Sequence, residues 1–272
     1  MNFSKEITDS LTKNEKKLVD YIYQNLQQFP LMSIQDISKN TNISEATISR
    51  LPKHLGYKNF KEMKQKLAFD ISPANKMTSA MAQEHSFSKY LMLQKEHLDR
   101  TIEYLNLDEL NEIVDKIITG KTIYVFAKGA SICLGELLAF RLRRFKKQVI
   151  IMPSSGSELF EILPMIKPDD FVILFGFMKT PIEGQVVLEF CKQKGIKTML
   201  MTSRLIEDEK KLADYNIYVY RGEETVYHSM TVPVAVIDAL IIEVAKVGGN
   251  EYMKSVDDIY QLKEKYKIKI QR

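Results

Sequence analysis

Residues 33–57 constrain the fold of this 272-residue chain most, because they predict two short helices joined by a tight turn. Ser33 can cap the first helix, and the carboxylate of Asp36, three residues later, can return the hydrogen bond. Ser44 can cap the second helix, and Gly56 follows its end, where glycine is common. Two helices joined in this way form the arrangement that places the second helix in the major groove of DNA.

The second helix should have one apolar and one polar face. Ile48, Leu51 and Leu55 are spaced as the buried stripe of an amphipathic helix. Residues 50–66 carry six lysines and arginines against one acid, an excess larger than the net charge of +4 of the whole chain. Polar helix faces are also common in ordinary bundles, but here the capped helix pair favours DNA binding. The residues predicted to contact DNA are Ser44, Glu45, Thr47, Ser49, Arg50, Lys53, His54, Lys58, Lys61 and Lys64.

Pro52 is unusual inside this predicted recognition helix. A proline in a helix interior removes a backbone hydrogen bond and costs roughly 3 kcal/mol. We therefore expect the helix to kink at Pro52, or its base-reading part to end before it. DNA binding survives either case, since only the first turns need to enter the groove.

Length and composition indicate two domains and a cytoplasmic protein. A chain of 272 residues with 45% hydrophobic residues can form two globular domains. Cys133 and Cys191 show no metal-binding spacing, so we expect free, mostly buried thiols and neither a disulfide framework nor a metal site. The first residues lack an apolar signal core, and no apolar run is long enough to span a membrane. We expect no cofactor and no membrane contact.

Further helices surround the helix pair. Residues 11–26 form a predicted helix that begins with a capping box of Thr12 and Glu15. Asn59 can cap another helix, with Glu62 three residues later. Residues 1–73 are therefore predicted to form an all-helical helix-turn-helix domain. Residues 74–106 should form a linker helix that leads into a second domain.

The pattern changes after residue 106, where short β-branched runs alternate with helices. Continuous apolar strands between helices are typical of a parallel sheet covered on both faces. We predict a doubly wound α/β domain with a five-stranded parallel sheet over residues 107–250. Residues 251–272 should form a basic helix that is solvated or packed in a dimer. The predicted strands are Thr122–Phe126, Gln148–Met152, Phe171–Phe175, Thr198–Met201 and Ile217–Tyr220.

Open parallel sheets bind ligands at the carboxyl ends of their strands. The loop after the first predicted strand contains Gly129 and leads into a helix that Ser131 can cap, and free amides at a helix N-terminus favour an anion. The second loop is rich in hydroxyls, which suit either a phosphorylated or hydroxylated ligand or an ordinary turn. The third loop is apolar and can contribute only two residues. The residues predicted to bind the effector are Lys128, Gly129, Ser131, Ser154, Ser155, Ser157, Lys179 and Thr180.

Residues 44–64 and the stretch Ala127-Lys-Gly-Ala-Ser131 resemble the RpiR family of bacterial transcription regulators, whose second domain is a sugar isomerase (SIS) domain. The resemblance spans nearly the whole chain, and Arg50 falls at the family's usual arginine. It implies a homodimer or higher oligomer that binds operator DNA near sugar-metabolism genes and responds to a sugar phosphate. In place of the family's Ser-x-Ser-Gly-x-Thr phosphate loop, residues 175–180 keep only the threonine.

Two alternatives stay open beside this interpretation. SIS folds also host aldose–ketose isomerases, which need a positioned general base. Glu158, Glu224 and His228 are candidates for that base, but each is more typical of a structural position, so we expect no catalytic residue. The second alternative is a regulator whose SIS domain only dimerises and has lost its ligand.

Overall fold

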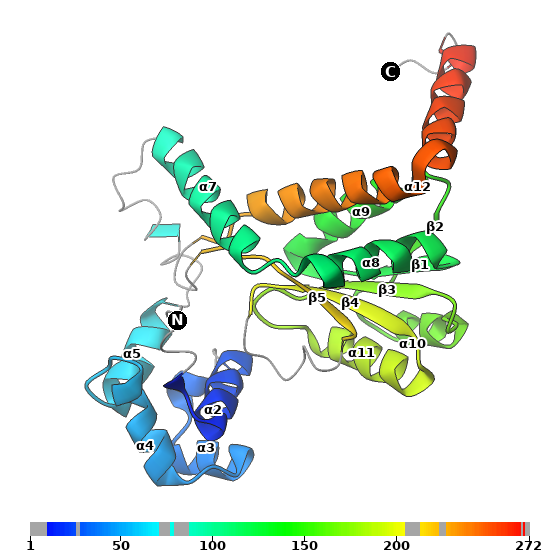
Figure 1. The fold of residues 1–272 in the computed structure, drawn as a ribbon. Helices are drawn as coiled ribbons and strands as arrows, with labels where there is room; N and C mark the ends of the chain where they lie inside the picture. The colour runs from blue at the N-terminus through cyan, green and yellow to red at the C-terminus, as the bar shows by residue number, and fades with distance from the viewer. Residues whose placement is uncertain are drawn as a thin grey trace. The chain divides into compact units, whose positions relative to one another are not determined.

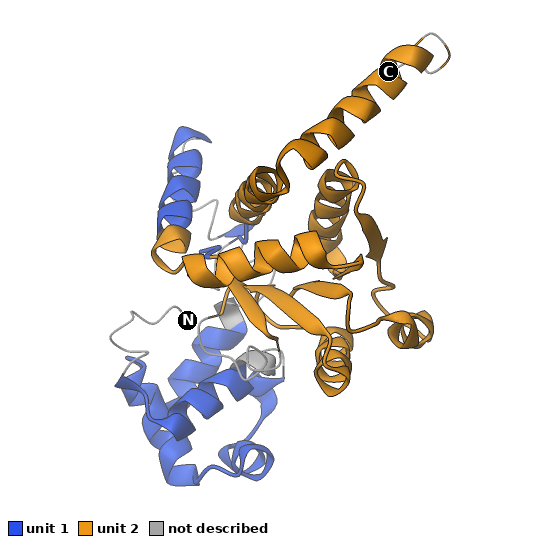
Figure 2. Ribbon diagram, turned by 45° about the vertical axis from the view of Figure 1, so that its right-hand side comes forward, with its two compact units in different colours: residues 1–99, 206–208, 220–229 blue, residues 100–205, 209–219, 230–272 orange. Residues whose placement is uncertain are grey.

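The computed structural model describes residues 10–25, 28–70, 77–78, 87–204, 213–222, 227–267 and 269 (Figure 1). The chain divides into two compact units, coloured separately in Figure 2. The first unit comprises residues 1–99, 206–208 and 220–229. The second comprises residues 100–205, 209–219 and 230–272.

The first unit begins with the predicted helical bundle. The predicted capping boxes are both present, with the Thr12 amide donating to Glu15 at 2.9 Å and the Ser33 amide donating to Asp36 at 2.8 Å. Asn42 ends the first helix of the pair in the left-handed conformation, at φ 56°. The elements are α2 (Lys13–Gln24), the 3-10 helix η1 (Phe29–Leu31), α3 (Ile34–Thr41), α4 (Glu45–His54) and α5 (Phe60–Asp70).

Apolar residues from every one of these helices meet in one core. The apolar stripe predicted for α4 is confirmed, because Ile48 and Leu51 are fully buried and Leu55 is 8% exposed. Phe29 of η1 packs edge-on against Phe60 of α5, with ring centroids 5.7 Å apart. The other members of the core include Leu18, Val19, Ile22, Ile37, Met63 and Leu67.

The helix α4 continues through Pro52 to His54, and the expectation of a kink at Pro52, or of a base-reading part that ends before it, stays a prediction. Pro52 is buried, and only two helical residues follow it. The backbone bonds around it are kept, because the Leu55 amide donates to the Leu51 carbonyl at 3.0 Å and the Tyr57 amide donates to the Pro52 carbonyl at 2.8 Å. The proline therefore lies in the last turn, where the loss of one bond affects little of the helix.

The predicted linker helix is described in part. Helix α7 spans Phe87–Glu103, within the predicted range of 74–106. Residues 74–76 and 79–86 lie outside the described residues. The buried His97 of α7 lies edge-on to Tyr220, with ring centroids 5.0 Å apart.

The second unit contains the predicted doubly wound α/β fold. Its sheet has five parallel strands in the order β2-β1-β3-β4-β5. Tyr124 of β1 is paired with Val172 of β3, and Leu174 of β3 with Leu200 of β4. The strands are β1 (Thr122–Phe126), β2 (Gln148–Ile151), β3 (Phe171–Phe175), β4 (Lys197–Thr202) and β5 (Tyr215–Tyr218).

Helices cover both faces of this sheet (Figure 1). Helices α8, α9 and α12 lie on one face, and α10 and α11 on the other. Phe126, Leu174 and Leu200 belong to the core between the sheet and the second of these layers. The helices are α8 (Leu107–Thr119), α9 (Ile132–Arg143), α10 (Glu158–Ile162), α11 (Ile182–Lys194) and α12 (Thr231–Tyr266), with 3-10 helices η2 (Gly129–Ser131) and η3 (Leu163–Met165).

Several boundaries differ from the prediction. Strand β2 ends one residue earlier than expected, and β4 extends one residue further at each end. Strand β5 begins and ends two residues earlier than expected, because its partner β4 ends at Thr202, which pairs with Tyr218. The apolar Val219 and Tyr220 are buried beyond that end. The last helix and the C-terminal tail form one element as far as Tyr266, interrupted at Gly249. Residues 251–266 of the predicted tail are thus helical, as expected.

The two thiols are free but differ in exposure. Cys191 is buried in the sheet core, and burial raises its pKa to about 12. Cys133 is exposed, which contradicts the expectation of buried thiols, and its Sγ donates to the Ala130 carbonyl at 2.9 Å. Across the part of the chain that the structure describes, no helix has the length and apolarity needed to cross a membrane. No cluster of metal-binding side chains occurs among the same residues.

Candidate functional site

The polar face of α4 is exposed along its length. Ser44 caps the helix by accepting a hydrogen bond from the Thr47 amide at 3.3 Å, and the two hydroxyls are 2.9 Å apart. Glu45, Ser49, Arg50 and Lys53 are exposed on the following turns, and Thr47 is half-buried. This face therefore presents the mixture of donors and acceptors that reads base edges.

Arg50 lies centrally on this face. Its Nε donates to the Ala46 carbonyl one turn earlier, at 3.2 Å. That bond fixes the start of the guanidinium and leaves its two terminal nitrogens with four further N–H donors. A guanidinium held in this way can donate two parallel bonds to a guanine edge or to a phosphate.

His54 and Lys64, both predicted to contact DNA, have partners inside the bundle. His54 Nδ1 lies 2.8 Å from Glu15 Oε1 of α2. Burial raises the pKa of the Glu15 carboxyl, but hydrogen bonds from Thr12 and the charge of His54 outweigh it, so the net pKa is lowered. Lys64 Nζ donates to the Met32 carbonyl at 2.6 Å. Both side chains therefore help to hold α4 and α5 in place.

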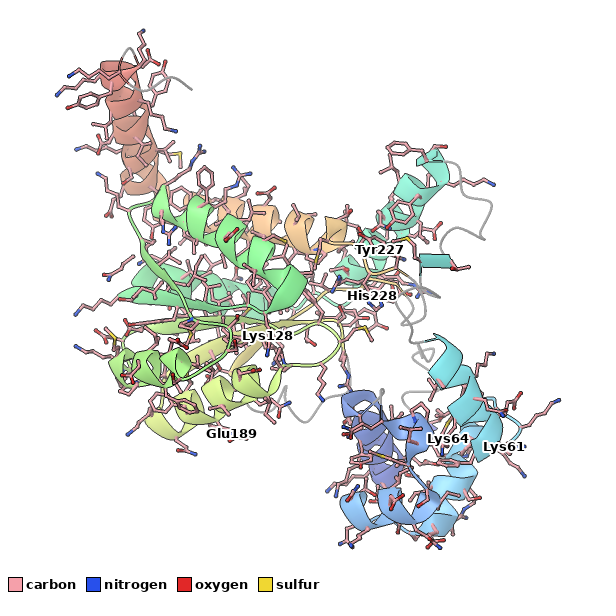
Figure 3. The ribbon with its side chains drawn as sticks, turned by 180° about the vertical axis from the view of Figure 1, so that it is seen from behind. Lys61, Lys64, Lys128, Glu189, Tyr227 and His228 are labelled. Carbon is pink, nitrogen blue, oxygen red and sulfur yellow. The ribbon has the colours of Figure 1, made fainter. Side chains whose placement is uncertain are left out.

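The remaining predicted phosphate contacts are exposed. Lys53 lies in the last turn of α4, Lys58 precedes α5, and Lys61 lies in its first turns. Figure 3 labels Lys61 and Lys64 on α5. The amide of Glu62 is bound by the Asn59 side chain at 2.9 Å, so the predicted cap of α5 is confirmed. These lysines share the same small bundle as the polar face of α4.

The predicted effector residues lie in three loops at the carboxyl edge of the sheet. In the first loop, Lys128 is exposed directly after β1, and Figure 3 shows it there. Gly129 has φ 60°, a conformation that favours glycine. Ser131 makes no capping bond to α9, so the predicted cap is wrong. The 3-10 turn η2 precedes α9 and gives Ser131 a helical backbone, unlike that of an N-cap.

The second loop contributes hydroxyls but only a short helix. Ser154 is half-buried, and Ser155 and Ser157 are exposed. Ser157 makes no capping bond to α10, which spans only Glu158–Ile162. The second loop therefore offers hydroxyl donors without the dipole of a long helix.

The third loop is closely packed. The side chain of Thr180 is 1% exposed, and its Oγ1 lies 2.6 Å from the position of a Cβ added to Gly176. A Cβ added to Gly184 would meet Thr180 Cγ2 at 3.0 Å. Phe177 is buried, while Lys179 is exposed. The threonine is thus held between two glycines, and Lys179 alone of the two predicted residues faces solvent.

Glu183, which the sequence analysis did not single out, joins the first loop to the third. Its Oε1 lies 2.6 Å from Lys128 Nζ. The pKa of the Glu183 carboxyl is lowered by the hydrogen bond from Lys128 and by its own backbone N–H. Because Glu183 lies in the first turn of α11, its carboxylate occupies the electropositive helix end. The sequence signal that could have indicated Glu183 was its position in the first helical turn after the third loop.

The candidate catalytic bases occupy ordinary positions. Glu158 is exposed at the start of α10. His228, labelled in Figure 3, accepts a hydrogen bond through its carbonyl from Arg221 Nη2 at 2.8 Å. Arg221 Nε donates to the Ser229 carbonyl at 2.9 Å, and burial lowers the pKa of Arg221 to about 10. Glu224 lies outside the described residues.

Comparison with protein-family models identifies both parts of the chain. The helix-turn-helix domain of the rpiR family matches residues 4–74, and the SIS domain matches residues 116–243. An uncharacterized HTH-type transcriptional regulator of Clostridium perfringens is 28% identical over 250 residues, which cover 86% of this chain and 88% of that protein. Another uncharacterized HTH-type transcriptional regulator, from Haemophilus influenzae, is 27% identical over 217 residues, which cover 76% of this chain and 74% of that protein.

Two solved structures share the fold. The NanR protein of Vibrio vulnificus, solved in complex with ManNAc-6P, aligns with a TM-score of 0.62 at 20% identity and covers 94% of each chain. The sugar isomerase domain of an RpiR transcription factor from Sphaerobacter thermophilus aligns with a TM-score of 0.60 at 17% identity. That alignment covers 64% of this chain and 97% of the other.

Proposed function

Since this chain belongs to the rpiR family of helix-turn-helix transcription regulators and carries a SIS domain, we propose that α4 reads operator DNA and that a sugar phosphate bound in the SIS domain modulates this binding. The observation that supports DNA reading is the exposed polar face of α4. Arg50 lies on this face, and the helix is held by its Ser44 cap and by the bond between His54 and Glu15. The genes controlled would be those of sugar metabolism.

The affinity should combine two kinds of contact. Lys53, Lys58 and Lys61 are exposed and can bind phosphates, which gives salt-dependent affinity without sequence preference. Ser49 and Arg50 can reach base edges, which gives the preference. Binding of the purified protein to its own upstream DNA and to random DNA, at two salt concentrations, tests this division. Equal affinity for both DNAs would contradict it.

The effector site is proposed at the carboxyl edge of the sheet. Lys128 and Lys179 supply charge, the first two loops supply hydroxyls, and α11 supplies a helix N-terminus. The NanR protein of similar fold was solved with the sugar phosphate ManNAc-6P, which supports the same ligand class here. We infer that operator binding changes because the effector favours one arrangement of the regulator.

Glu183→Gln should strengthen sugar-phosphate binding. The wild-type carboxylate neutralises Lys128 and occupies the N-terminal end of α11, so it competes with a phosphate for both. The pair is partly exposed, with Lys128 at 40% and Glu183 at 22%. Such pairs contribute about 0.2–1 kcal/mol, so the dissociation constant should fall about 1.4- to fivefold. Isothermal titration calorimetry with a panel of sugar phosphates measures this dissociation constant.

Glu189→Gln is the matched control. Glu189 is exposed on the same helix and is labelled in Figure 3, and its replacement removes the same charge away from Lys128. It should leave the dissociation constant unchanged. Equal tightening in both variants would show that Glu183 does not compete specifically, and no binding in any variant would contradict the sugar-phosphate proposal itself.

We further propose a cytoplasmic, non-enzymatic protein that acts as a homo-oligomer. Glu158 is exposed at the start of the short helix α10, and the His228 carbonyl accepts a hydrogen bond from the Arg221 guanidinium, which are structural positions. An assay of aldose–ketose isomerisation on common sugar phosphates should therefore give no turnover. Because operators of helix-turn-helix dimers contain two half-sites, a dimer would present two copies of α4 at a fixed spacing.

A further inference from the structure

Helix α12 changes direction at Gly249, and the part beyond, residues 250–266, is called here the C-terminal arm. Gly249 has φ 56° and ψ −138°, which only glycine adopts readily. A Cβ on Gly248 would clash with the Tyr252 ring, so the ring packs directly on the backbone. Tyr252 also stacks on Phe145, with centroids 4.8 Å apart and planes 7° from parallel. The direction of the arm is thus set by a specific local structure.

One ion pair joins the arm to the residues that follow α9. Lys146, which follows α9, lies 2.6 Å from Asp258 of the arm through its Nζ. Tyr252 and Ser255 are the only buried residues of the arm. From residue 256 onward, no arm residue is buried against the described part of its unit, and Figures 1 and 2 show these turns extending away from it.

The outer turns are nevertheless amphipathic. Met253, Tyr260 and Leu262 are 48%, 54% and 58% exposed. With Val256 and Ile259 they lie on one half of the helix, whereas the lysines and acids lie mostly on the other half. Short helices are marginal in water and are stabilised by packing of their apolar face. The arm therefore carries an apolar face that its own unit leaves uncovered.

An open groove adjoins this face within the same unit. A hollow of about 370 Å³ lies among α9, the first part of α12 and the arm, lined by Arg141, Phe145, Ile241, Ile242 and Met253 among others. A second hollow of about 230 Å³ continues along the arm. Ile242 is 64% exposed at the edge of the first hollow. Apolar groove and apolar arm thus form one continuous surface.

We propose that this surface binds a second copy of the chain, with the arm of each copy lying in the groove of the other. An arm cannot fill the groove of its own chain, because it forms one wall of that groove. In a two-fold dimer each surface is used twice, so one chain supplies both the apolar ridge and the groove that receives it. The surface therefore needs no foreign partner.

The charges at the rim of the groove also fit the arm of a second copy of the chain. Arg144 lines both hollows, with its guanidinium 5.1 Å above the Phe140 ring. Asp257 is exposed on the arm. Among the described residues neither forms an ion pair, so each copy offers one cation and one anion to its partner. Complementary rim charges favour the correct pairing of two surfaces.

This inference extends the proposed dimeric regulator by locating its interface, and one pair of variants tests it. Tyr260→Lys places a cation on the apolar face, next to Lys263 and Arg144. Gln261→Lys places the same charge on the neighbouring residue, which lies on the polar side of the arm. Sedimentation equilibrium of the full chain should show dimers for wild type and Gln261→Lys. Tyr260→Lys should raise the dimer dissociation constant at least about tenfold, as expected at an interface hot spot.

Thermal unfolding of each variant shows whether the fold is kept, since the arm lies outside the sheet core. A monomeric wild type at micromolar concentration would overturn the inference. A dimer that Tyr260→Lys leaves as tight as wild type would also overturn it. Binding to upstream DNA is measured on the same samples, so a wild-type protein without preference for that DNA would instead contradict the proposed regulator.

Discussion

Replacing Phe29 with alanine is expected to destabilise the helix-turn-helix bundle strongly and to leave the stability of the α/β domain unchanged. Phe29 is fully buried and packs against Phe60 in the centre of the bundle core. Truncating a buried phenylalanine costs about 3–5 kcal/mol. A domain of about 70 residues has a total stability of roughly 4–10 kcal/mol, so this loss is a large part of it. Operator binding should be lost with the bundle.

Leu31→Ala is the matched control, because Leu31 belongs to the same 3-10 helix but is 87% exposed. Its replacement should change stability by no more than about 0.5 kcal/mol. Urea unfolding followed by circular dichroism should show an early transition that moves in Phe29→Ala alone and a later one that is common to all variants. Coincident curves for Phe29→Ala and Leu31→Ala would contradict the core position of Phe29.

Arg50→Ala is expected to weaken operator binding by about 5- to 150-fold, because a good bidentate contact with a base contributes about 1–3 kcal/mol. Affinity for random DNA should fall much less. The ratio of the affinity for operator DNA to the affinity for random DNA should therefore decrease. Fluorescence anisotropy with operator and random duplexes measures both. Arg50→Lys should recover binding to random DNA but not the preference, since lysine keeps the charge without the planar fork.

Lys53→Ala gives the contrasting result if Lys53 binds phosphate. Binding to both duplexes should then be weakened alike. The slope of log affinity against log salt concentration, which is negative, should become less steep by about one. Lys95→Ala removes one charge from the exposed face of α7 and should have no such effect. If Arg50→Ala weakened both duplexes equally, Arg50 would be a phosphate contact and the base reading would lie elsewhere on α4.

Local features could be predicted from the sequence because they depend on residues a few positions apart. The capping bonds of Ser33 and Ser44 and the apolar stripe of α4 are of this kind. Strands β1 and β3 were predicted with their exact ends, because each is a short apolar run fully buried in the sheet. The predicted start of β5 was wrong, because the ends of this strand depend on where its partner β4 ends.

Features that depend on tertiary contacts could not be predicted. His54 meets Glu15, Lys64 meets Met32, and Lys128 meets Glu183, each across more than thirty residues of sequence. The cap expected from Ser131 after β1 does not form, because the 3-10 turn η2 precedes α9 and gives Ser131 a helical backbone. Sequence patterns thus predicted the elements that carry the candidate site residues, whereas the partners that orient those side chains could be found only from the fold.

The strand order has a mechanical consequence for the pair of Lys128 and Glu183. The strands β1 and β3 are neighbours in the sheet, but the helices that follow them, α9 and α11, lie on opposite faces (Figure 1). The chain diverges at this point, and the ion pair bridges the two sides. The pair lies beside the β1–β3 strand pairing, which already holds these neighbouring strands together. A ligand that draws Lys128 away from Glu183 would break a contact between the loops on the two sides and leave the strand pairing of the sheet unchanged.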